Sequence, residues 1–167
     1  MIFRAERPGD EANIAAVTAA AFAGMPHSDG SEPAIIAHLR DAGDLSVSLV
    51  AESDGEIVGH IAFSPVTFST DETGWYALGP LSVLPEYQGQ GIGGQLIRKG
   101  LDKLGSLDAC GCVLLGDPAL YSRFGFIQDH KLSSPGLPPE YLMALALRGQ
   151  VPSGMLNFHA AFAGDAA

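Results

Sequence analysis

The most constraining feature of the chain is a cluster of glycines placed directly after an apolar, strand-like segment. Residues 81–83 are strand-like, and four glycines then fall within the six residues 89–94, where helical apolar spacing begins. A simple turn needs one or two glycines, not four. Without side chains, a ligand can approach the free N–H groups of the first helical turn, where the helix dipole favours negative charge. The segment therefore predicts a cradle for an anion, and phosphate is the anion we expect.

A dinucleotide is one candidate ligand, because residues 89–94 also satisfy the pattern G-x-G-x-x-G. The dinucleotide-binding fold places an acidic residue at the end of the strand that follows the motif, about 20 residues on. Asp108 lies at that distance but before the next apolar run, and only about 70 residues follow the motif. This is too short for the second half of a doubly wound sheet. The lack of a G-K-[ST] arrangement also excludes a nucleotide triphosphatase loop.

Hydrophobic periodicity predicts an α+β (α/β) fold in one domain spanning residues 1–167. Apolar residues at helical spacing indicate helices, and alternating or continuous apolar runs indicate strands. Helices are expected at 11–22, 32–42, 91–104 and 118–123, and strands near the N-terminus and at 45–52, 56–64, 76–84, 110–115, 124–130 and 141–147. Hairpins thus come first and a βαβ crossover later. The core is expected over about 1–148, and the order of the tail 150–167 is left open.

Local signals predict where several elements begin, turn and end. Asp10 is a candidate N-cap, and Gly43 and Gly105 are expected to end the second and third helices. Asp54-Gly55 predicts a hairpin turn. Gly79-Pro80 predicts a bulge or splayed strand, because proline donates no ladder hydrogen bond and glycine has no side chain to pack.

Charge and composition exclude several classes of partner. The net charge is −10; residues 1–85 carry −9, whereas residues 86–131 are neutral yet hold over half of the basic residues. This balance disfavours nucleic acid and points to 86–131 as the segment that meets an anionic ligand. No apolar run reaches the roughly 18 residues of a membrane span, and no secretory signal is evident. With Cys110 and Cys112 interpreted as reduced core thiols, we expect a cytoplasmic protein without a membrane partner.

Two motifs resemble those of the GNAT family of N-acetyltransferases. Residues 88–93, Gln-Gly-Gln-Gly-Ile-Gly, resemble its (Q/R)-x-x-G-x-(G/A) acetyl-CoA signature, preceded by the Val-x-Pro-like Val83-Leu84-Pro85. Residues 121–126, Tyr-Ser-Arg-Phe-Gly-Phe, look like its Tyr-x-x-x-Gly-Phe, and the order of elements agrees over about 1–148. The resemblance, to a small bacterial branch with no assigned acceptor, implies a mixed, mostly antiparallel central sheet flanked by helices and splayed at the acetyl-CoA strand. Gly116-Asp117-Pro118 departs from the asparagine common in the family.

The resemblance also implies acetyl-CoA as cosubstrate, with no metal. Backbone amides of the glycine loop would hold the pyrophosphate of coenzyme A, and the splayed strand would pair by main chain with the pantetheine arm. The implied cofactor-binding residues are Leu81, Ser82, Val83, Gln88, Gly89, Gln90, Gly91, Ile92, Gly93 and Gly94.

The implied reaction is direct attack of an amine on the thioester in a ternary complex, which requires an acid for the thiolate and a base for the amine. By resemblance Tyr121 would be the general acid; alternatively it is a core tyrosine whose hydroxyl meets a carbonyl. Glu52, His60 and Glu86 are candidates for the base, and no spacing singles one out. His60 also fits a packed, hydrogen-bonded core histidine.

His27 and Glu32, in or beside the loop between the first two helices, are candidates for contacts with the acceptor. The acidic charge of residues 1–85 favours a cationic acceptor. We therefore expect an acetyl-CoA-dependent N-acetyltransferase for a primary amine of a small molecule or peptide, acting as a monomer or homodimer. The alternative is a catalytically silent coenzyme A-binding sensor or partner module, and a dinucleotide-binding fragment comes third.

Overall fold

A six-stranded sheet organises the computed structural model, which describes residues 1–129 and 131–163. The strand order is β1-β2-β3-β5-β6-β8, and every neighbouring pair is antiparallel except β5 and β6. The strands are β1 (Ile2–Ala5), β2 (Val47–Ser53), β3 (Glu56–Pro65), β5 (Trp75–Val83), β6 (Gly111–Leu115) and β8 (Leu142–Ala146). The helices are α1 (Glu11–Phe22), α2 (Glu32–Asp41), α3 (Ile92–Ser106) and α4 (Pro118–Tyr121). The expected α+β fold with a mostly antiparallel sheet is confirmed.

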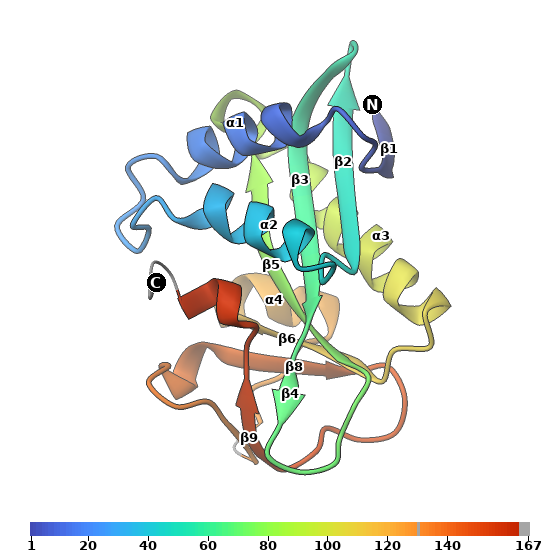
Figure 1. Ribbon diagram of the computed structural model, residues 1–167, viewed down its shortest axis with the longest axis vertical. Helices are drawn as coiled ribbons and strands as arrows, with labels where there is room; N and C mark the ends of the chain where they lie inside the picture. The colour runs from blue at the N-terminus through green and yellow to red at the C-terminus, as the bar shows by residue number, and fades with distance from the viewer. Residues whose placement is uncertain (130, 164–167) are drawn as a thin grey trace.

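Helices cover both faces of this sheet. The paired helices α1 and α2 cross one face, and α3 lies behind the other (Figure 1). On the α3 face, Leu96, Ile97 and Leu104 are buried in one cluster with Ile61 and Phe63 of β3. Burying each such side chain contributes about 1.5–3 kcal/mol, so the amphipathic stripe of α3 anchors the helix that follows the glycine loop.

Two of the predicted turn signals are confirmed. At Gly43 the backbone is left-handed, its N–H donates to Arg40, and the N–H of Asp44 donates to Leu39. This double hydrogen bond ends α2 in a Schellman motif. Asp54 and Gly55 both have positive φ, as the hairpin turn between β2 and β3 requires.

The first helix begins at Glu11 directly after Asp10, as predicted, but the expected side-chain cap at Asp10 and the expected helix end at Gly105 need correction. Asp10 precedes α1, but its carboxylate binds Arg4 and the N–H of Arg7 instead of capping the helix. Gly105 does not end α3, which continues to Ser106. Asp108 takes the left-handed position after the helix, at φ 61°, and its N–H returns to the carbonyl of Gly105. Asp108 therefore supplies the stop that was expected of glycine.

The two parallel strands separate part-way along their length. Pairing between β5 and β6 covers only Trp75 to Ala77 on β5, although β5 continues to Val83. On its other edge β5 stays bound to β3, with a register shift where Gly79-Pro80 lies opposite Ala62. The expected irregularity and splay are confirmed, and the β6-facing edge of residues 78–83 is left without a strand partner within the described residues.

A second, three-stranded sheet was not predicted. It consists of β4 (Thr67–Phe68), β9 (Gly154–Asn157) and β7 (Leu132–Ser133), in that order. Figure 1 shows β4 and β9 beside one another. The tail thus contributes a strand, and its 3₁₀ turn at Ala160–Ala163 packs against α2. Buried Leu156 and Ala161 extend the core beyond residue 148.

The strand predicted over residues 124–130 is wrong. Phe124 ends a 3₁₀ turn, Gly125 has φ 93°, and within the described residues 124–129 only Ile127 forms a bridge, to Ala144 of β8. The left-handed residue breaks the extended backbone that a strand needs. The last residue of the predicted strand, His130, lies outside the described residues.

Candidate functional site

The glycine loop forms a cradle of backbone N–H groups at the start of α3. Gly89 and Gly91 have φ 78° and 82°, and Gly91 is the N-cap residue. In the described part of the chain, no side chain caps this end of the helix. The first-turn N–H groups therefore point out of the helix without an intrahelical partner. Because a left-handed backbone disfavours side chains, glycine is needed at both positions.

The remaining loop residues divide between ligand-facing and structural positions. Ile92 is buried and belongs to the core. The Gln88 side chain donates from Nε2 to the carbonyl of Val83 at 3.0 Å, which ties the loop to the end of β5. Gln90 is exposed, and a Cβ at Gly93 would approach only Val83, at 3.8 Å. The loop is thus fixed at the end of β5, with its backbone open.

The candidate cofactor strand leads directly into this cradle. Leu81, Ser82 and Val83 pair with Ile61, His60 and Gly59 of β3 along one edge. Their other edge faces the gap that opens where β6 diverges. A strand edge without a partner offers alternating N–H and C=O groups to an extended ligand. β5 ends at Val83 and α3 begins at Ile92, so the unpaired edge of the strand is followed along the chain by the cradle.

Tyr121 lies on the β6 side of the gap, at the end of α4. Its ring packs against the α3-side core and makes an edge-to-face contact with Phe126, with centroids 6.1 Å apart. Burial raises the pKa of the Tyr121 hydroxyl, and nearby Cys112 raises it further. Within the described residues, no hydrogen bond occupies this hydroxyl. The proton is therefore retained at neutral pH and is available for donation.

His60 is fully buried on β3, directly opposite Ser82 of β5. Its Nε2 lies 2.8 Å from the Ser48 hydroxyl, while its Nδ1 has no partner among the described residues. The Ser82 hydroxyl is likewise buried without a partner. Burial lowers the pKa of His60 to about 4, so the imidazole is neutral at pH 7.

The other two candidate bases are placed differently. Glu52 accepts a hydrogen bond from Arg4 at 3.3 Å, and β3 separates its strand, β2, from β5. Glu86 is exposed in the 3₁₀ turn Pro85–Tyr87 between β5 and the glycine loop. Of the three, the structure brings only His60 beside the candidate cofactor strand.

The candidate acceptor residues lie in the loop between α1 and α2 and at the start of α2. Glu32 lines a surface pocket there together with Phe22 and Ser28, and the Ser28 hydroxyl donates to its carboxylate at 2.7 Å. His27 is exposed in the same loop but is not among the residues lining the pocket. The two candidates therefore lie close in sequence, His27 in the loop and Glu32 at the start of α2, but do not line the same cavity.

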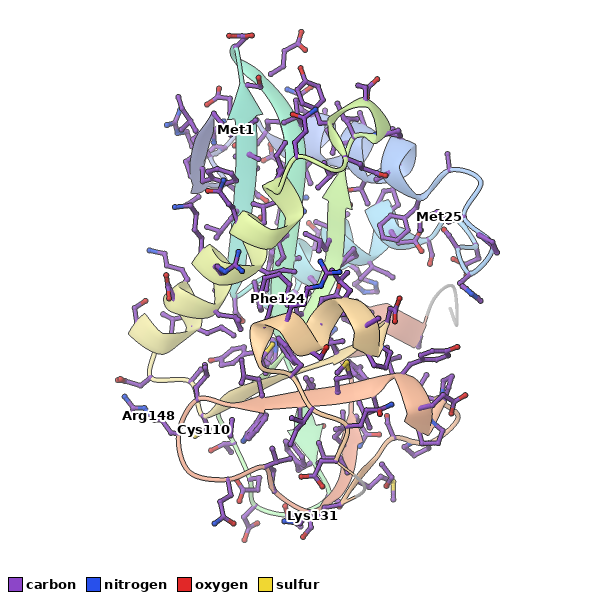
Figure 2. The ribbon with its side chains drawn as sticks, turned by 180° about the vertical axis from the view of Figure 1, so that it is seen from behind. Met1, Met25, Cys110, Phe124, Lys131 and Arg148 are labelled. Carbon is purple, nitrogen blue, oxygen red and sulfur yellow. The ribbon has the colours of Figure 1, made fainter. Side chains whose placement is uncertain are left out.

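Sequence reasoning missed a cation beside the cradle. The Arg98 guanidinium lies over the Phe124 ring, 4.9 Å from its centroid, and reaches back to within 3.5 Å of where a Cβ at Gly94 would stand. Phe124 lies where α3 approaches the turn after α4 (Figure 2). Stacking of this kind holds a flexible arginine in place. Spacing on one helix face, with Arg98 four residues after Gly94, could have indicated it.

Other chemistry is sparse in the described part of the chain. No group of three or more His, Cys, Asp or Glu side chains is arranged to hold a metal ion among the described residues. Both cysteines are free; Cys112 is buried and Cys110 half-buried. Among the described helices, none combines the length and apolarity that a membrane crossing requires.

Comparison with known proteins agrees with this geometry. Residues 15–126 match the family model described as Acetyltransferase (GNAT) family. A GNAT family acetyltransferase from Brucella melitensis, solved in complex with acetyl-CoA, is 49% identical with a TM-score of 0.87, covering 96% of this chain and 97% of that one.

Two Escherichia coli comparisons extend the match. The GNAT family N-acetyltransferase YhbS, solved in complex with CoA, is 34% identical with a TM-score of 0.89, covering 98% of this chain and 92% of that chain. The strain K12 protein named "Uncharacterized N-acetyltransferase YhbS" is 42% identical over 127 residues, which are 75% of this chain and 73% of that protein. The chain therefore belongs to the GNAT family of acetyltransferases.

Proposed function

We propose that this protein transfers the acetyl group of acetyl-CoA to a primary amine of a small molecule or peptide, by direct attack in a ternary complex. The observation that carries the proposal is that β5, unpaired on one edge after Ala77, is followed by the glycine start of α3. An extended thioester arm fits the strand edge, and a diphosphate fits the free N–H groups beyond it. Membership of the GNAT family and the acetyl-CoA and CoA complexes of two relatives support this ligand.

Acetyl-CoA would supply the acetyl group as an activated thioester. The N–H groups of residues 89–94 would bind its pyrophosphate, and Arg98 would add positive charge beside them. Leu81, Ser82 and Val83 would hold the pantetheine arm by main-chain hydrogen bonds. A backbone N–H at the splayed segment would also stabilise the oxyanion, a contribution of about 3 kcal/mol in comparable sites.

Proton transfer would involve one group on each side of the gap. Tyr121 would donate a proton to the departing thiolate, since its hydroxyl stays protonated at neutral pH. His60, on the strand beside β5, would serve the amine as base, because its Nδ1 is unpartnered. Glu52 is less suited, since Arg4 neutralises it at a distance from β5.

The acceptor would approach from the α1–α2 side of the sheet. The Glu32 pocket lies on that side, and residues 1–85 carry a net charge of −9. Both features favour a cationic amine. Cytoplasmic location and the choice between monomer and homodimer stay predictions from the sequence.

The first experiment combines acetyl-CoA with a broad panel of amines and follows release of free thiol. Thiol release with at least one amine is expected. The alternative, a silent coenzyme A-binding sensor, predicts binding without release. Thermal shifts with acetyl-CoA, coenzyme A and NAD give the binding arm, because a ligand at 100 times its dissociation constant stabilises by about 2.7 kcal/mol. Stabilisation by NAD alone would contradict the cofactor assignment.

A further inference from the structure

A chain of hydrogen bonds runs from α2 through the sheet to His60. The Arg40 guanidinium binds the Glu6 carboxylate at 2.8 and 3.0 Å. The Ser48 hydroxyl lies 2.6 Å from the same carboxylate and 2.8 Å from Nε2 of His60. Four side chains from four separate segments are therefore connected in one line.

The direction of each proton in this line follows from what each group can do. A carboxylate only accepts hydrogen bonds, so the single Ser48 proton goes to Glu6. The Ser48 oxygen is then left to accept from His60, which places the imidazole proton on Nε2. Nδ1 consequently carries a bare lone pair, and it is the atom with no hydrogen-bond partner among the residues that the structure describes.

His60 lies on the sheet face covered by α1 and α2, the side from which the acceptor is proposed to approach. His60 pairs with Ser82 in the β3–β5 register, and residues opposite one another share a face, with Cβ atoms about 4.5–5.5 Å apart. The Ser82 hydroxyl is also buried and unpartnered. Val50, on the same face of β2 opposite His60, packs against α1 and α2. Two unpartnered polar groups thus sit side by side next to the strand assigned to the cofactor.

We propose that Glu6, Ser48 and His60 form a proton relay that removes the proton of the attacking amine. The relay rests on the proposed function. The amine proton, passed directly or through Ser82, would bind Nδ1 of His60, while the Nε2 proton moves to Ser48 and the Ser48 proton moves to Glu6. One proton enters and one reaches Glu6, whose side chain keeps 14% of its surface exposed and can release it to solvent. Ser48 and Glu6 act through His60 and are positioning residues.

The relay resolves a difficulty that a simple histidine base would face. Burial disfavours a charged imidazole at this position, and of the charged groups acting on it, Glu6 favours the charge while Arg40 opposes it. Concerted movement of the three protons along the line exchanges one neutral histidine tautomer for the other and never requires a lasting imidazolium. The positive charge instead stays on Arg40, and the proton reaches the carboxylate that Arg40 holds in place.

The test compares Ser48→Ala, which breaks the line, with Ser48→Thr, which keeps the hydroxyl. Ser64→Ala is the matched control, because Ser64 is also buried on β3 with an unpartnered hydroxyl but lies outside the line. General-base catalysis contributes about 10²–10⁴-fold, so Ser48→Ala is expected to lower kcat at least ~10-fold and to remove the solvent deuterium isotope effect on kcat. The acetyl-CoA dissociation constant should stay within about two-fold, and Ser48→Thr should restore kcat.

Two further measurements keep the test decisive if Ser48→Ala does not fold. Glu6→Gln keeps an acceptor for Ser48 but takes up a proton far less readily, and it should lower kcat in the same way. Nitrogen NMR of the unaltered protein should find the His60 proton on Nε2; a proton on Nδ1 would overturn the relay. If the unaltered protein releases thiol but Ser48→Ala and Ser64→Ala have the same kcat, the relay is overturned and the proposed function is not. Absence of release with every amine would overturn the proposed function as well.

Discussion

Mild acid should destabilise the fold through one residue, His60, which is buried as a neutral imidazole. Burial lowers its pKa to about 4, from 6.5 in an exposed histidine. Between these two pH values the unfolded chain binds a proton that the folded protein refuses. The free energy of unfolding therefore decreases as the pH falls from about 6.5 to 4, and it recovers as the pH rises.

The size of the effect follows from the two pKa values. One pKa unit corresponds to about 1.4 kcal/mol. Titration of His60 should therefore lower the free energy of unfolding by about 2 kcal/mol between pH 7 and pH 5, and by about 3 kcal/mol in total below pH 4. Glu6 and Asp10 titrate at lower pH. Burial alone would raise the pKa of Glu6, but the hydrogen bonds from Arg40 and Ser48 outweigh it, so the net shift is downward. The hydrogen bond from Arg4 lowers the pKa of Asp10. The window from pH 7 to 5 therefore isolates histidine.

The assay is urea unfolding at pH 7, 6, 5.5 and 5, for the unaltered protein and for His60→Gln. Glutamine keeps an amide donor for Ser48 but has no titratable group in this range. The unaltered protein should lose about 2 kcal/mol more than the variant over the window. Equal losses in the two proteins would show that His60 is not held neutral by burial, and would refute the reasoning.

Four substitutions test the site and the packing of α3. Tyr121→Phe should lower kcat at least ~10-fold with unchanged coenzyme A affinity; an unchanged rate would remove the hydroxyl from the mechanism. Gly91→Val should abolish acetyl-CoA binding in calorimetry, because its φ of 82° disfavours a side chain at the open cradle; retained binding would refute the loop assignment. Gly100→Ala should lose about 1–3 kcal/mol in urea unfolding, because the new methyl would collide with the Phe63 ring. Gly105→Ala, with open space around it, should instead gain up to ~1 kcal/mol; the same sign for both would contradict the packing argument.

Local sequence signals predicted what depends on local geometry. The glycines of the cradle, the Asp54-Gly55 turn and the irregular Gly79-Pro80 pair each impose a backbone conformation that neighbouring residues hardly alter. The long helices followed from apolar spacing for the same reason. The predicted helix end at Gly105 was wrong because an exposed helix tolerates glycine. The chain instead leaves the helix after Ser106, and Asp108, two positions on, adopts the left-handed conformation.

Tertiary contacts decided what the sequence could not. Strands of two to four residues, such as β4 and β7, have too few positions for a periodicity of two to be visible. The face occupied by His60 was hidden as well. Ala51 pairs with Gly59 while Glu52 pairs with Ile57, so Val58 is an extra residue that breaks simple alternation along β3.

The hydrogen-bond line could not be predicted, because its members lie far apart in the sequence. Glu6 and Ser48 are separated by 42 positions, and Glu6 and Arg40 by 34. Judged from its sequence neighbours alone, each of these residues looks like a surface charge or a solvent-facing residue of a strand. Only the β1–β2–β3 order, with α2 laid across it, brings them together beside β5 (Figure 1). On its unpaired edge, β5 therefore offers the proposed binding track for the thioester arm. On its other edge it pairs with β3, which carries His60 and the proposed path for the amine proton, so that acetyl transfer and proton removal would meet at one strand.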